Sequence, residues 1–224
     1  MDNETYPDKR VIQWAGQVVP VKINPEKSQS DVAKHFGVRG YPTILFINPD
    51  GQVEGKIPGY EAAGPFAHTM RKLVMAHRYY SEAEPKYERD PKDVEAICKL
   101  SAASSLRDDP EHAKDLIVEA KAADPKNANG YLAIAYNALG DYYREHGPVD
   151  TAIVAFQKAA QSGKQPADLA YAHISLALCH EDQKQFGEAL SELDKAVAVP
   201  DCPKNFKDQA QELRTKIEKE QNGA

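Results

Sequence analysis

The spacing of apolar residues divides the chain into two parts. Before about residue 80, apolar residues come in short runs separated by Pro and Gly, and runs of about five are typical of strands. Such runs at 18–23 (Val-Val-Pro-Val-Lys-Ile) and 43–47 (Thr-Ile-Leu-Phe-Ile) predict two strands. After residue 80, apolar residues recur every three or four positions, which is typical of amphipathic helices. We therefore predict an α/β part followed by an all-α part.

The first part has the order α-β-α-β-β-α. The turn residues Asn-Pro-Asp-Gly at 48–51 predict a tight connection to a third strand at 52–57, which must run antiparallel to the strand before it. A short helix is expected at 30–36 and a longer one at 62–80. Residues 1–15 resemble the later part of another helix. This order places two adjacent strands between helices.

The second part is divided by prolines at positions typical of the first residue of a helix. We predict seven helices, at about 91–106, 110–123, 128–146, 149–161, 166–183, 186–198 and 203–221. The predicted domains are therefore residues 1–80 and residues 91–224. The junction at 81–90 can also be interpreted as an extension of the helix before it.

The middle of the second part carries a repeat motif. Tyr136-x-x-Leu139-Gly140-x-x-Tyr143 is followed by Ala152-x-x-x-Phe156-x-x-Ala159, and this pair of patterns resembles the tetratricopeptide repeat (TPR). Two looser copies flank it, and the repeated alanines are 113, 152 and 189. The resemblance implies an all-α, TPR-type domain of three helix pairs, closed by a capping helix at 203–221.

TPR domains bind a protein or peptide partner on a concave face. Carried over to this sequence, that role would fall to residues of the first helix in the second and third pairs, namely Ile134, Asn137, Asp141, Arg144, Tyr171, Ile174, Leu178 and Glu181. An alternative is that the repeats only dock against the first domain or against another subunit. The oligomeric state stays open.

The first part resembles a partial thioredoxin-like domain. Gly37-Val38-Arg39-Gly40-Tyr41-Pro42-Thr43 precedes a strand, a tight turn and a strand, as the cis-proline loop does in that fold. Met1-Asp2-Asn3-Glu4-Thr5-Tyr6 is similar to the stretch after the C-x-x-C motif in the C-terminal domain of thiol:disulfide interchange proteins. The resemblance covers residues 1–78. It implies thiol–disulfide exchange, with substrate contacts at Gly40, Tyr41, Pro42 and Thr43.

The departure from this family is the missing pair of cysteines. Its chemistry needs a thiolate at a helix N-terminus, where the dipole lowers the thiol pKa. The 224 residues hold three cysteines, Cys98, Cys179 and Cys202, with no C-x-x-C spacing. We therefore expect no catalytic residue in this chain, and favour a chain that starts after the motif. The alternative is a naturally shortened, redox-silent module. In either case, strands 18–23 and 43–47 would lack their common neighbour.

Charge and composition narrow the functional classes to which the chain can belong. The chain has 28 basic and 34 acidic residues, a net charge of −6, which disfavours nucleic acid as the main partner. Residues 1–80 hold 10 of the basic and 8 of the acidic residues, so 18 and 26 remain for the helical part. No apolar stretch is long enough for membrane insertion. The seven histidines show no H-x-x-x-H spacing, so we expect neither a metal nor a cofactor.

Three functions remain open from the sequence. The first is a thioredoxin-like/TPR protein of thiol–disulfide exchange type, whose repeats bind a protein partner and whose intact parent is an oxidoreductase. The second is a non-enzymatic adaptor with a redox-silent thioredoxin-like platform, and the third is a helical scaffold with a poorly folded first half. Similar proteins often act in the bacterial envelope, but the sequence leaves envelope, periplasm and cytoplasm all open.

Overall fold

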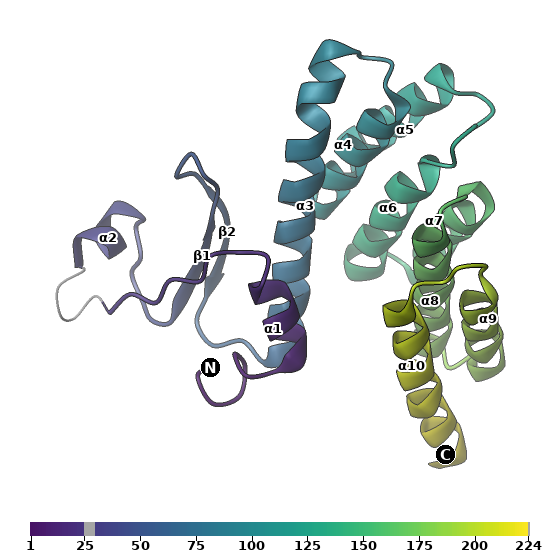
Figure 1. Cartoon of the computed structure of the whole chain (residues 1–224). Coiled ribbons are helices and arrows are strands. Elements are labelled where there is room, and N and C mark those ends of the chain that lie inside the picture. The colour runs from purple at the N-terminus through teal and green to yellow at the C-terminus, as the bar shows by residue number, and fades with distance from the viewer. Residues whose placement is uncertain (25–29, 224) are drawn as a thin grey trace. The chain divides into compact units, whose positions relative to one another are not determined.

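The computed structural model of the chain describes residues 1–24 and 30–223 (Figure 1). The chain divides into two compact units, Met1–Arg78 and Tyr79–Ala224. Helix α3 (Ala63–Arg89) runs unbroken from the first unit into the second, so the predicted junction at 81–90 is mostly helical. Among the described residues, none of the helices has the length and apolar character needed to span a bilayer.

The first unit is built around a two-stranded antiparallel sheet. Strand β1 (Thr43–Ile47) pairs with β2 (Val53–Pro58) in a register that joins Thr43 to Pro58 and Ile47 to Val53. Asn48 fixes the turn between them, because its Oδ1 accepts hydrogen bonds from the backbone N–H groups of Asp50 and Gln52. Gly51 supplies the positive φ, of 81°, that the turn needs. The predictions of these two strands and of their direction are confirmed.

The predicted strand at 18–23 is wrong. These residues form no regular strand, and Val19 and Val21 are 89% and 74% exposed. A strand is stabilised only by a neighbour that accepts and donates its backbone hydrogen bonds, and Pro20 has no N–H to donate. Within the described residues, the sheet offers this segment no such neighbour.

The first unit has one small apolar core. Helix α1 (Lys9–Ala15) begins later than predicted, because the side chain of Asp8 caps it by accepting from the N–H of Arg10; residues 2–7 are turns. Helix α2 is Ser30–His35. The core joins α1, β2 and α3 through five buried side chains, Val11, Ile57, Phe66, Ala67 and Met70.

The second unit contains seven further helices. They lie close to the predicted ones, and prolines begin two of them as expected. Their bounds are α4 (Val94–Leu106), α5 (Pro110–Ala123), α6 (Leu132–His146), α7 (Val149–Ser162), α8 (Pro166–Asp182), α9 (Phe186–Ala198) and α10 (Lys204–Gly223).

These helices pack as consecutive pairs. Helix α4 packs with α5, α6 with α7 and α8 with α9, and α10 covers the last pair, as Figure 1 shows. Small residues permit the close approach inside a pair. A Cβ added to Gly140 would lie 2.6 Å from the ring of Phe156, and Ala152 beside it is fully buried. The alanines at 113 and 189 are equally buried in the other two pairs.

Candidate functional site

The loop at 40–43 follows α2, ends at Thr43, the first residue of β1, and has a defined geometry. The hydroxyl of Thr43 donates to the carbonyl oxygen of Gly40 over 2.7 Å. The N–H of Gly59 donates to the carbonyl oxygen of Pro42, also over 2.7 Å, which ties the loop to the end of β2. The Tyr41–Pro42 peptide bond is cis. All four residues predicted to contact substrate therefore lie together.

This loop borders an open hollow of about 370 Å³, lined on its other side by Lys56, Pro58 and Gly59. Tyr41 is 60% exposed. Its backbone N–H and C=O make no hydrogen bond with any residue that the structure describes. An unpaired donor and acceptor on one residue can pair with an extended polypeptide, in the manner of a sheet edge.

The three cysteines are poor nucleophiles. Cys98 in α4 and Cys179 in α8 are fully buried, and burial raises the pKa of each thiol to about 12. Cys202 is free and 6% exposed. Because the thiolate is the reactive form, Cys98 and Cys179 stay protonated near neutral pH. All three belong to the second unit, whereas the loop at 40–43 belongs to the first.

The predicted partner-binding residues on α6 and α8 are partly brought together. The hydroxyl of Tyr171 donates to both carboxylate oxygens of Asp141, at 2.7 and 2.8 Å. Arg144 Nε donates to Asp182 over 3.0 Å. These contacts place the two helices side by side with polar groups facing one another. Ile134, also predicted here, is half-buried on α6.

The predicted contacts in the second half of α8 need a correction. Ile174 is 1% exposed, in a core cluster that includes Leu213 and Ile217 of α10, and Leu178 packs against the same cluster. Glu181 is buried and lies 2.7 Å from the ammonium of Lys216 on α10. The apolar face of α10 thus covers positions that were expected to face a partner, because the last pair must bury its open side.

Asp168 was not predicted as a site residue. Asn137 Nδ2 donates to its backbone carbonyl over 3.0 Å, while Asn137 Oδ1 is buried and has no hydrogen-bond partner among the described residues. A buried acceptor left unpaired costs about 1–3 kcal/mol. Burial raises the pKa of the Asp168 carboxyl to about 6, and no described residue gives that carboxyl a hydrogen bond or an ion pair. Sequence patterns do not mark Asp168 as a site residue, because acidic residues are common in the first turn of a helix.

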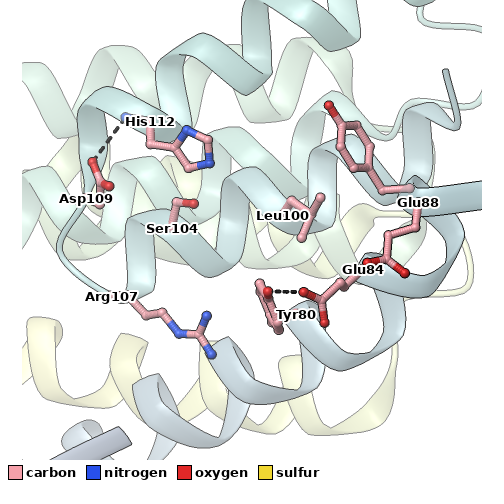
Figure 2. A pocket seen from close by; sticks show the side chains of 9 residues that line it. Tyr80, Glu84, Glu88, Leu100, Ser104, Arg107, Asp109 and His112 are labelled. Atoms are coloured by element: carbon pink, nitrogen blue, oxygen red, sulfur yellow. Dashed lines mark hydrogen bonds between the residues drawn. The ribbon is translucent and has the colours of Figure 1, made fainter. Parts of the chain in front are cut away.

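A second hollow, of about 580 Å³, lies between the last turns of α3 and helices α4 and α5 (Figure 2). Tyr80 donates a hydrogen bond to Glu84, and the guanidinium of Arg107 lies 4.7 Å from the centre of the Tyr80 ring. Ser104 lines the hollow. It precedes Tyr143 by 39 residues, which is also the distance in sequence between Ala113 and Ala152. A small residue at the position that Tyr143 holds in the predicted repeat was thus the sequence signal for this hollow.

One exposed group could offer three metal ligands. Atoms of Asp108, Glu145 and His146 lie within 4.8 Å of one another. His146 Nε2 is 3.2 Å from Asp108 and 3.5 Å from Glu145, distances that fit hydrogen bonds between the side chains themselves. We assign the group no role beyond these contacts.

Comparison with known proteins identifies the first part of the chain. Residues 2–73 match the family model of a thioredoxin-like domain. No curated protein and no solved structure matches the chain. The matched segment contains the loop at 40–43 and both strands, and the remaining residues form a helical part consistent with helical repeats. Residues 2–73 are therefore a thioredoxin-like domain.

Proposed function

We propose that this chain recognises extended polypeptide segments in thiol–disulfide exchange, with Gly40, Tyr41, Pro42 and Thr43 as the contacts. The observation that carries the proposal is the exposed Tyr41 beside an open hollow, whose backbone N–H and C=O make no hydrogen bond with a described residue. A thioredoxin-like domain at residues 2–73 supports a function related to thiol–disulfide exchange. In this role Tyr41 pairs backbone to backbone with the bound segment.

The three cysteines of this chain do not supply the attacking thiolate in this proposal. The raised pKa of Cys98 and of Cys179 supports this, as does the low exposure of Cys202. Exchange proceeds through attack by a thiolate on a disulfide sulfur, so a buried, protonated thiol contributes little. The chain then contributes binding rather than bond breaking.

The helical part binds a protein partner through the polar side chains that α6 and α8 turn toward one another. We infer TPR-type repeats from the three packed pairs, from the close approach of Gly140 to Phe156, and from the buried alanines of each pair. The contacts in this proposal are Asn137, Asp141, Arg144 and Tyr171. Ile174 and Leu178 are left out because they pack in the core cluster that α8 shares with α10.

Disulfide reduction by the chain tests the thiol part of the proposal. In a turbidity assay of insulin reduction by dithiothreitol, we expect the chain to leave the rate within twofold of the reaction without protein, because all three thiols are buried and the pKa values of Cys98 and Cys179 are raised. A thioredoxin with an intact C-x-x-C serves as the positive control. Acceleration of more than tenfold that disappears in a Cys98→Ala/Cys179→Ala/Cys202→Ala variant would contradict the proposal.

A second candidate function is a non-enzymatic adaptor, in which the thioredoxin-like domain is only a folding platform. The same buried cysteines favour it. The two functions differ at Tyr41. The first function requires a polypeptide segment to bind at the loop at 40–43, whereas an adaptor of this kind does not.

A further inference from the structure

Two cationic side chains line the hollow beside Tyr41, and they come from different segments of the chain. Arg39 immediately precedes the loop at 40–43, and Lys56 lies on β2. The remaining residues that line the hollow are uncharged. Both cations are exposed, so a ligand in the hollow can reach them. The lining therefore combines two positive charges with no carboxylate.

The register of the hairpin places Lys56 on the face of the sheet that bears the loop residue Thr43. Lys56 pairs with Leu45, and Pro58 pairs with Thr43. Paired residues of antiparallel strands project from the same face, and alternate residues of one strand do so too. Ile57 projects from the opposite face, into the apolar core of the first unit. Lys56 therefore points away from that core and stays available beside the loop.

Neither cation is neutralised by an acidic side chain of the first unit. Arg39 and Lys56 form no hydrogen bond and no ion pair with any residue that the structure describes. Glu54, the acidic residue of β2, lies 3.1 Å from Nδ1 of His77. Residues 1–80 as a whole hold 10 basic and 8 acidic residues, so the excess of positive charge extends beyond the hollow. Such an excess attracts acidic ligands over a longer range.

We propose that the extended segment bound at the loop carries an aspartate or glutamate side chain that faces Arg39 and Lys56. A carboxylate accepts hydrogen bonds from ammonium and guanidinium groups, which only donate them. In an extended segment every second side chain points the same way. A segment that pairs with the backbone of Tyr41 therefore brings alternate side chains to the hollow. This inference rests on the proposed recognition of extended segments by the loop, and adds the chemical class of the segment.

A peptide scan tests the inference. Nine-residue peptides of serine, threonine and valine, labelled with fluorescein and free of thiols, carry one glutamate, glutamine or lysine at each position in turn. Their affinity for the full chain is measured by fluorescence anisotropy at low ionic strength, because salt screens exposed charges. We expect glutamate to bind about three- to tenfold more tightly than glutamine at one position, or at two positions that are two residues apart. Lysine at the same positions should bind less tightly than glutamine.

The double variant Arg39→Gln/Lys56→Gln should reduce the preference for glutamate to less than twofold, while the affinity of the glutamine peptides stays within twofold. Lys9→Gln is the matched control and should keep the preference, because Lys9 is an exposed cation on α1 that does not line the hollow. Circular dichroism verifies that both variants fold.

The outcomes separate the two proposals. Peptides that bind without a preference for glutamate, or with one that the double variant leaves unchanged, would overturn the inference and leave the proposed recognition of extended segments intact. An absence of binding by every peptide of the scan would contradict both.

Discussion

Replacing Phe156 by alanine is expected to lower the free energy of unfolding of the helical part by about 3–5 kcal/mol. Phe156 is fully buried in α7, where it packs with Ala152, Leu176 and Cys179. Its ring also fills the space left by the missing side chain of Gly140. Truncation would leave a cavity between two helix pairs that neither pair can close without moving. Urea unfolding followed by circular dichroism measures the loss.

Val154 provides the control on the same helix, because it is 48% exposed and Val154→Ala should change stability by less than about 0.5 kcal/mol. Phe156→Leu keeps most of the volume and should lose less than the alanine variant. A loss below 1 kcal/mol for Phe156→Ala would show that α6 and α7 do not pack as described.

Asp168→Asn is expected to raise the free energy of unfolding at pH 7, by about 1–3 kcal/mol. Burial raises the pKa of this carboxyl from 3.8 to about 6, so the folded chain holds the proton where the unfolded chain releases it. The contribution of the Asp168 carboxyl to the free energy of unfolding therefore falls as pH rises from about 4 to about 6, and stays low above that. An amide is neutral at every pH and avoids this loss.

The pH dependence distinguishes this explanation from a general effect of the substitution. Unfolding curves at pH 4 and pH 7 should give nearly equal stabilities for variant and parent at the lower pH, and a clear gain for the variant at the higher pH. A gain of the same size at both values, or a loss at pH 7, would contradict the burial of an unpaired carboxylate at this position.

Local sequence patterns predicted most of the secondary structure. The prediction of the two strands and their turn succeeded, because the backbone pairing and the turn that define this hairpin involve only neighbouring residues of the chain, at 43–47, 48–51 and the strand after them. The helices of the second part have their own start signals, such as Pro110 and Pro166. The segment at 18–23 has the composition of a strand but depends on a distant neighbour, and a pattern read along the chain cannot supply that neighbour.

The candidate sites were less predictable for the same reason. The loop at 40–43 ends ten residues before β2 begins, so its surroundings follow from local structure. The burial of Ile174 and Glu181 depends on α10, which begins 23 residues after Glu181. The unpaired acceptors at Asn137 and Asp168 arise from the contact of two helices, and neither residue is unusual in its own helix.

Photo-crosslinking from position 41 tests whether the loop at 40–43 contacts extended polypeptide segments. Benzoylphenylalanine replaces Tyr41 in the full chain, and carboxymethylated insulin B chain serves as an unfolded polypeptide without thiols. The same group at Ile12, which is 56% exposed in α1, is the control. We expect crosslinks to the B chain from position 41 to exceed those from position 12 at least fivefold. Equal labelling from both positions, or none from position 41, would contradict recognition of extended segments by this loop.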